Sequence, residues 1–436
     1  MTSVPSMNAI RHLQRVYYSI LFLRWFAGAL PIPFVILIMQ KRGLNLAQIG
    51  LISGLYSLTI VLLELPTGGL ADALGRKPVA LAAHSFLLLA NVVFLLAFSF
   101  YAYLAAYVLL GIGRALSSGA LDAWFVDKLL EHDPNYNLQP PLAYVETFGT
   151  LGLALGALTG GIIPQLFSYL PNEASTMFTP FAMTFIVSIA VRVVAMLVIV
   201  VGVRETRDDA RDTLNTAFTP RKLSFILADA INLSRKSQLV LLLLAGSLVA
   251  SLALMSVETF WQPHFAALAE RSPNSLLFGT LMTLGFLMGT VGNLASIRLS
   301  RLFKQRHGFV AALSQGLAAI SILVLASQTR FLPAASLFCG YYFSLAMGNA
   351  PVAAIFNREI PSNRRSSMQS ILSLAGYSGS FLGSFVLGLI AHTYSVSTAW
   401  LITGIILLIS SLLYVRAERL TQDSLSASTV SAEPTR

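Results

Sequence analysis

The sequence predicts an all-α membrane protein whose twelve transmembrane helices form two pseudo-symmetric six-helix bundles. Of its 436 residues, 11% are charged and 56% are hydrophobic, and the mean hydropathy is +0.72. Soluble domains carry about 25% charged residues, so this chain cannot cover a surface that faces water. Lipid is therefore its expected solvent.

Twelve apolar runs are long enough to cross a bilayer core, which needs about 20 helical residues. The first run is too long for a signal peptide and contains Arg24. The expected spans are residues 17–40, 46–68, 78–98, 103–130, 142–164, 179–203, 238–265, 276–302, 308–328, 333–356, 367–393 and 396–415.

Basic residues set the expected orientation of these spans. Twenty-two of the 29 Lys and Arg residues fall in segments on the same side of the membrane as the N-terminus, and four fall in loops on the opposite side. Because cytoplasmic loops are enriched in Lys and Arg, we expect a multi-pass protein of the inner or plasma membrane with both termini in the cytoplasm. The net charge of +10 is therefore explained by basic residues that orient the spans. Because this charge needs no other explanation, nucleic acid is not an expected partner.

The longest polar stretch separates six spans from six. Its second half, residues 220–238, has an apolar side flanked by basic residues and suits a helix lying on the inner membrane surface; a solvated linker is the alternative. The expected parts are an N-terminal six-helix bundle (1–203), a cytoplasmic linker with an amphipathic helix (204–237), a C-terminal six-helix bundle (238–416) and a disordered cytoplasmic tail (417–436).

The two halves repeat each other. The sequence GGLAD at 68–72 matches GNLAS at 292–296, and four glycines of the fifth span recur in the eleventh span at a constant offset of 227. Parallel repeats of this kind build transporters with a substrate site near the middle of the membrane. The repeat therefore favours a transporter of a small molecule. The glycines are Gly149, Gly152, Gly156 and Gly161, followed by Gly376, Gly379, Gly383 and Gly388.

A charged turn follows the second span and reads GGLADALGRK from Gly68 to Lys77. Gly68 and Gly75 permit a tight turn, Asp72 can accept hydrogen bonds at a helix end, and Arg76 and Lys77 hold the turn at the cytoplasmic surface. The turn resembles the loop motif G-x-L-A-D-r-x-G-r-K of the major facilitator superfamily. The resemblance of the sequence to this superfamily extends over nearly the whole chain.

The resemblance implies a major facilitator fold in which this turn latches the two bundles in the outward-facing state. A charged loop without a gating role is the alternative. The latch residues that the resemblance assigns are Gly68, Asp72, Gly75, Arg76, Lys77 and, on the fourth span, Asp127.

Two other motifs also resemble this superfamily. The segment from Arg114 to Gly119 is similar to R-x-x-q-G, with one residue more and no Gln. The fifth span resembles the G-x-x-x-G-P-x-x-G-G motif of the antiporter branches, with Ala157 at the proline position. This similarity implies export by antiport, as does the likeness of ELPTG at 64–68 to bacterial multidrug exporters. The matching glycines are Gly152, Gly156, Gly160 and Gly161.

Charged residues inside spans cost at least about 2.5–3.5 kcal/mol each, so each calls for a functional or structural reason. Arg24 and Glu64 fall at similar depth and are expected to pair, either as a structural contact or as part of a gate. On the fourth span, Arg114, Ser118 and Asp122 are spaced to share one face of a helix. The full set is Arg24, Glu64, Arg114, Asp122, Glu146, Arg192 and Glu258.

Asp122 and Glu146 are the expected proton-coupling residues. Carboxylates that lie close together and away from water can take up a proton near neutral pH, which a proton-coupled carrier requires. A static ion pair with Arg114 is the alternative. Glu258, in the segment ETFWQP, is a candidate for binding a cationic substrate or a proton, although Trp261 beside it also suits an interfacial aromatic belt.

Aromatic residues of the spans are candidates for an adaptable apolar pocket, with ordinary packing as the alternative for each. The candidates are Trp25, Tyr56, Trp124, Phe260, Trp261 and Tyr377.

The sequence contains no Walker loop, no catalytic motif and no Cys/His cluster. We therefore expect no enzyme activity, no metal and no cofactor, with a proton gradient as the energy source. The expected function is alternating-access, proton-coupled efflux of amphipathic or cationic small molecules by a monomer. A facilitator or symporter for a defined metabolite or sugar is the first alternative, and a non-transporting membrane sensor is a remote one.

Overall fold

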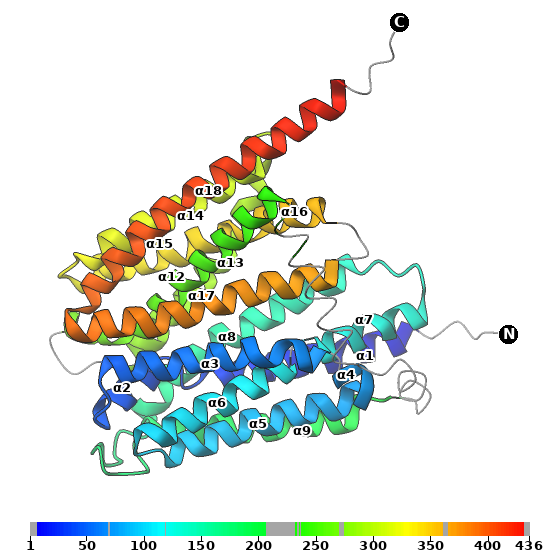
Figure 1. Ribbon diagram of the computed structural model, residues 1–436. Helices are drawn as coiled ribbons and strands as arrows, with labels where there is room; N and C mark the ends of the chain where they lie inside the picture. Colours follow the sequence, from blue (N-terminus) through cyan, green and yellow to red (C-terminus); the bar gives the residue numbers. More distant parts are fainter. Residues whose placement is uncertain are drawn as a thin grey trace, which may run out of the picture. The chain divides into compact units, whose positions relative to one another are not determined.

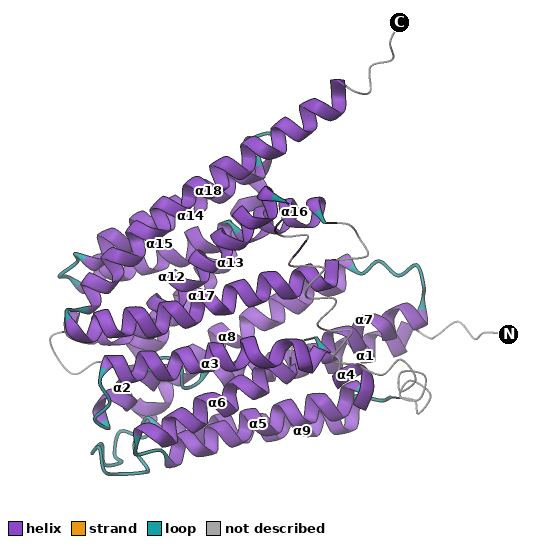
Figure 2. Cartoon of the chain, in the orientation of Figure 1, coloured by secondary structure: helices purple, strands orange, loops and turns teal. Residues whose placement is uncertain are grey.

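The computed structural model of the chain describes residues 7–68, 70–117, 119–205, 237–269, 274–360 and 365–430, together with residues 232 and 235. Within these residues the regular structure is entirely helical (Figure 2). Most of the expected amphipathic helix of the linker lies outside the described residues. The predicted fold class, a helical membrane protein, is confirmed.

Two compact units contain the helices, and Figure 1 shows their order along the chain. The helices of the first half are α1 (Met7–Ala29), α2 (Val35–Lys41), α3 (Leu46–Gly68), α4 (Leu70–Leu74), α5 (Arg76–Leu96), α6 (Phe100–Ser117), α7 (Ala120–His132), α8 (Gln139–Leu166) and α9 (Ala182–Gly202). Those of the second half are α12 (Gln238–Leu268), α13 (Ser275–Leu302), α14 (His307–Ala326), α15 (Phe331–Met347), α16 (Asn349–Glu359), α17 (Arg365–Thr393) and α18 (Val396–Val430).

Eleven stretches of described helix are long and apolar enough to cross a membrane, and they correspond to predicted spans two to twelve. The first predicted span, 17–40, is divided between α1 and α2 by a turn at residues 30–34. Pro31 and Pro33 lie in this turn, and proline lacks the N–H that a continuous helix needs. The tenth span is likewise divided, between α15 and α16 at Gly348.

The compact units differ from the two sequence halves in one segment. Unit 1 consists of Met1–Pro220 and Arg271–Phe286, and unit 2 consists of Arg221–Glu270 and Leu287–Arg436. Residues 271–286 group with unit 1 because small side chains let the start of α13 approach α8 closely. Ser275 Oγ donates to Gly161 O at 2.9 Å, and Thr283 Oγ1 donates to Ala154 O at 2.9 Å.

The expected disordered tail is a second difference. α18 continues to Val430, so residues 417–430 are helical, while 431–436 lie outside the described residues. Residues 417–430 contain neither Pro nor Gly, and Ala417 is completely buried in unit 2. Glu418 Oε2 accepts a hydrogen bond from Gly308 N at 2.9 Å, which fastens this end of α18 to the start of α14.

The core of unit 1 determines where the polar side chains of α1 and α7 point. Tyr17 of α1 is 2% exposed and stacks on Phe125 of α7, with ring centres 4.3 Å apart. Trp124, Leu129 and Ile199 belong to the same buried cluster. Asp122 lies one turn before Phe125 on the same side of α7, where its carboxylate meets the Tyr17 hydroxyl at the edge of this cluster and stays exposed.

Candidate functional site

A cavity of about 300 Å³ lies within unit 1. Four charged side chains that the sequence singled out line it, and they come from four different helices, α1, α6, α7 and α8. The lining residues are Leu21, Arg24, Trp25, Arg114, Ser117, Gly119, Asp122, Val145, Glu146, Gly149, Thr150 and Leu153.

A helix break places two of these charges. The expected single stripe of Arg114, Ser118 and Asp122 on one continuous helix is wrong, because α6 ends at Ser117 and α7 begins at Ala120. Gly119 between them has φ +80°, a left-handed conformation that glycine adopts without strain. Ser118 lies outside the described residues. Arg114 and Asp122 nevertheless reach the same cavity from the two sides of the break.

The two arginines of the cavity share an aromatic neighbour, Trp25. Arg24 Nη2 donates to Ser117 Oγ at 2.8 Å. The guanidinium carbons of Arg24 and Arg114 lie 5.3 and 5.4 Å from the centre of the Trp25 ring, within cation–π range. The expected pair of Arg24 with Glu64 is not among the ion pairs of the described residues, and Glu64 on α3 does not line the cavity.

The two carboxylates of the cavity, Asp122 and Glu146, are more exposed than its two arginines. Asp122 Oδ1 accepts a hydrogen bond from the buried hydroxyl of Tyr17, a partner that sequence reasoning missed because it lies 105 residues away. Both Asp122 and Glu146 are exposed. Within the described part of the chain, Asp122 forms no ion pair within 4 Å. Neither carboxylate is therefore shielded from the cavity.

Glu258 lies in unit 2, outside the charged cavity. It is half-buried on α12, with the side chains of Tyr341 and Tyr342 beside it. Trp261, one turn further along α12, is fully buried and packs on Phe338 with ring centres 5.4 Å apart. In this structure Trp261 is a core residue.

Of the aromatic candidates, Trp25 alone lines the charged cavity. Trp124 and Phe260 are buried like Trp261, and Tyr56 packs edge-on against Tyr107, with ring centres 6.4 Å apart. Tyr377 on α17 is half-buried. The alternative of ordinary packing fits Trp124, Phe260, Trp261 and Tyr56.

The charged turn after α3 contacts the rest of unit 1 through Arg76, whose side chain forms an ion pair with Asp127 of α7. A third partner was not expected from the sequence: Glu205 Oε1 accepts hydrogen bonds from the backbone N–H groups of Arg76 and Lys77, at 2.6 and 2.9 Å. Glu205 thus caps the start of α5. The gating role of this turn stays a prediction.

Other members of the turn are fixed by backbone geometry. Gly75 has φ +91°, which a larger residue adopts only with strain. Lys77 Nζ donates to the carbonyl oxygens of Val200 and Val203 at 2.7 and 2.8 Å, at the end of α9 where such oxygens lack helical partners. Gly68 ends α3 and Asp72 lies on α4, but the surroundings of both lie outside what the structure describes.

The glycines that resemble the antiporter motif lie where α8 crosses α1. A Cβ at Gly152 would lie 2.7 Å from Phe22 O, and one at Gly156 would lie 2.5 Å from Phe26 O. Gly160 meets Leu30 O in the same way, and Gly161 faces the start of α13. These positions therefore permit close helix packing, as small residues do in membranes.

Substituting Gly156 with Leu is expected to destabilise the protein by about 1–3 kcal/mol, because the added side chain has no room against α1. The control is Gly316→Ala on α14, where a Cβ would meet nothing within 4 Å. Thermal unfolding of the detergent-solubilised protein measures both variants. A Gly156→Leu protein as stable as Gly316→Ala would show that this close packing is not required.

Arg192 is buried more deeply than a snorkelling arginine. It is 3% exposed on α9, and its Nε and Nη1 atoms have no hydrogen-bond partner among the described residues. The sequence alone suggests that Arg192 extends to the membrane surface or caps carbonyl groups, but its burial excludes the first role and these two atoms do not take the second.

Comparison with known proteins places these features in a family. Residues 17–384 match the family model of the Major Facilitator Superfamily. An uncharacterised MFS-type transporter of Bacillus subtilis (strain 168), YxaM, is 21% identical over 404 residues, which are 92% of this chain and 94% of that protein.

Solved structures resemble the fold at low sequence identity. The nucleoside transporter NupG matches with a TM-score of 0.73 and 13% identity, over 94% of this chain and 99% of that chain. A bacterial homologue of the human lysosomal transporter Spinster, in an inward-facing and unoccupied conformation, matches with a TM-score of 0.76 and 15% identity, over 95% and 98%. The helices, the repeat and the family match lead to one conclusion: this chain belongs to the major facilitator superfamily and is a multi-pass membrane transporter.

Proposed function

We propose that this transporter is a proton-coupled exporter of amphipathic or cationic small molecules. It works by alternating access as a monomer in the cell membrane, with both termini in the cytoplasm and no cofactor. The observation that carries the proposal is the charged cavity of unit 1, in which Asp122 is exposed and hydrogen-bonded to Tyr17. Charged groups inside membrane spans are rare and mark substrate or proton pathways.

Asp122 is the proposed proton carrier. A proton carrier must exchange its proton with water on one side and then with water on the other, so it cannot be locked in a permanent ion pair. Asp122 meets this condition, because its hydrogen-bond partner is the neutral Tyr17 hydroxyl and its carboxylate reaches the cavity. Glu146, exposed on the same cavity, is the proposed second acidic group.

The cavity wall supports a cationic or amphipathic substrate. Ser117 and the Trp25 ring engage the guanidinium group of Arg24, and Trp25 also lies near that of Arg114. The carboxylates of Asp122 and Glu146 are exposed, so negative charge is more available to a ligand than positive charge. Binding of the substrate cation and of the proton would then compete for the same carboxylates, which couples their movements in opposite directions.

Proteoliposomes with an imposed pH gradient test this function. We expect tetraphenylphosphonium to accumulate in vesicles with an acidic lumen, with the membrane potential clamped, because protons leaving the lumen drive the cation inward. A pH difference of one unit supports at most about tenfold accumulation for one-to-one exchange. Accumulation that is the same with and without the gradient would contradict proton coupling.

A facilitator or symporter for a defined neutral solute is the second candidate. The observation that favours it is a cavity of about 310 Å³ in unit 2 whose lining residues are all uncharged. A facilitator would bring a neutral solute to equal concentrations across the vesicle membrane and a symporter would concentrate it, while tetraphenylphosphonium would not move in either case.

A further inference from the structure

The internal repeat places equivalent residues in contact at two helix crossings, α1 with α8 in unit 1 and α12 with α17 in unit 2. In unit 1 the carbonyl oxygen of Phe22 on α1 meets Gly152 on α8. In unit 2 the carbonyl oxygen of Leu248 on α12 meets Gly379 on α17. One turn along, Phe26 meets Gly156, and the same step in unit 2 brings Leu252 to Gly383. Position n of α1 therefore corresponds to position n + 226 of α12.

This register relates the two cavities. The α1 residues that line the charged cavity of unit 1 are Leu21, Arg24 and Trp25. Their counterparts on α12 are Ser247, Ala250 and Ser251, and all three line the cavity of unit 2. The unit 2 cavity thus occupies the repeat-equivalent place in its own bundle, where an alanine and a serine replace the arginine and the tryptophan.

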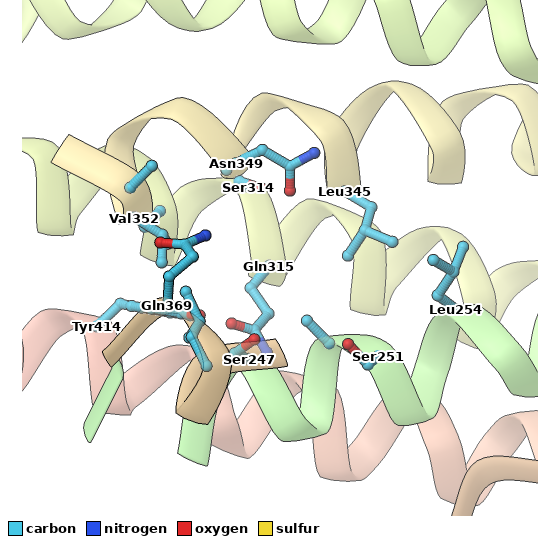
Figure 3. Close-up of a pocket in the computed structure, with 15 residues that line it drawn as sticks. Ser247, Ser251, Leu254, Ser314, Gln315, Leu345, Asn349, Val352, Gln369 and Tyr414 are labelled. Atoms are coloured by element: carbon cyan, nitrogen blue, oxygen red, sulfur yellow. The ribbon is translucent and has the colours of Figure 1, made fainter. Parts of the chain in front are cut away.

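The unit 2 cavity is built from neutral hydrogen-bonding groups (Figure 3). It has a volume of about 310 Å³, and none of its fifteen lining residues carries a charge. Serine and carboxamide side chains from four helices, α12, α14, α16 and α17, line it. They are Ser247, Ser251, Ser314, Gln315, Asn349 and Gln369.

Gln315 provides the strongest indication that the cavity takes a ligand. It is 3% exposed, and its Nε2 donates to Ser410 Oγ at 2.7 Å. Its Oε1 is buried and has no hydrogen-bond partner among the described residues. Buried acceptors in proteins almost always have a donor, and a donor group on a molecule in the cavity would satisfy this oxygen.

We propose that the unit 2 cavity is a binding site for an uncharged molecule, or the uncharged end of a larger one, that carries hydroxyl or amide hydrogen-bond donors. Serine hydroxyls and carboxamides can both donate and accept, so they suit groups of the same kind. A bare ion would lose its hydration without meeting an opposite charge, which costs several kcal/mol. The site goes beyond the proposed proton coupling and does not depend on it.

Protection of an introduced thiol tests the site without a proton gradient. Ser251→Cys is made in a Cys339→Ser background, and its alkylation by N-ethylmaleimide is followed in the full-length protein in lipid nanodiscs. D-glucose and uridine are the neutral probes, and tetraphenylphosphonium is the charged comparison. We expect at least one neutral probe to slow alkylation in a saturable manner, and tetraphenylphosphonium to leave the rate unchanged.

Gln315→Met separates binding from folding. This substitution keeps the length of the side chain but removes its hydrogen-bonding atoms, so we expect about fivefold weaker protection. Gln328→Met, two residues beyond the end of α14, makes the same chemical change outside the cavity and is expected to leave protection unchanged. Equal alkylation rates for the two variants in the absence of probe serve as the check on folding.

Three outcomes would overturn the proposal: no protection by either neutral probe, stronger protection by tetraphenylphosphonium, or equal protection in Gln315→Met and Gln328→Met. The first would show that the cavity holds only water. None of these outcomes bears on proton coupling through Asp122, because the assay imposes no gradient. Conversely, loss of proton coupling in the transport assay leaves this binding site unaffected.

Discussion

Asp122→Asn is expected to abolish gradient-driven accumulation of tetraphenylphosphonium in proteoliposomes. Asparagine keeps the shape of the side chain and can still accept the hydrogen bond from Tyr17, but it cannot carry a proton. The roughly tenfold accumulation that a one-unit gradient supports should therefore fall to equilibrium across the membrane. Uptake of the labelled cation with an acidic lumen measures this directly.

The matched control is Asp133→Asn, in the loop after α7. Asp133 Oδ1 accepts a hydrogen bond from Asn135 N at 2.9 Å, which an asparagine oxygen can replace. We expect this variant to accumulate the cation like the wild type. Asp122→Asn should still exchange labelled for unlabelled cation, because Glu146 still offers the cation a carboxylate and exchange needs alternating access but not a net proton movement. Gradient-driven accumulation by Asp122→Asn at the wild-type level would contradict the assignment.

Reversing the charge of Arg76 is expected to slow transport about tenfold, provided that its ion pair with Asp127 stabilises one of the alternating states by about 1.4 kcal/mol. Arg76→Asp places two carboxylates together, and the double variant Arg76→Asp with Asp127→Arg restores opposite charges. We expect the double variant to recover most of the rate. Initial transport rates in the same vesicles provide the measurement.

The exposed pair of Lys128 with Glu131 on the same helix is the control for this experiment. Exposed ion pairs add little to stability, so neither Lys128→Ala nor Arg76→Asp should change the unfolding temperature much. A slow Lys128→Ala variant, or a double variant no faster than Arg76→Asp, would show that the Arg76 pair has no special role in gating.

The sequence was sufficient to predict the helical membrane fold, the span positions and the charged residues that meet in unit 1. These features follow from hydropathy, from the cost of charge in lipid and from the glycine repeat. Arg24, Arg114, Asp122 and Glu146 were all expected to matter, and they line one cavity.

Features that depend on partners distant in sequence were not predictable. Tyr17 and Glu205 look like ordinary residues until folding brings them to Asp122 and Arg76. The break at Gly119 was missed because a glycine in a membrane span can equally well be helical. The neutral cavity of unit 2 was missed for a related reason: uncharged polar residues spread over several spans have no pattern that separates them from residues used in helix packing.

The reciprocal flux experiment tests proton coupling most directly. Proteoliposomes carrying a pH-sensitive dye in the lumen, with no imposed pH gradient and a clamped membrane potential, receive tetraphenylphosphonium on the outside. Coupled antiport predicts that the lumen becomes alkaline as the cation enters and protons leave, and that Asp122→Asn shows no such change. Entry of the cation through the wild-type protein without any change in lumen pH would contradict the account.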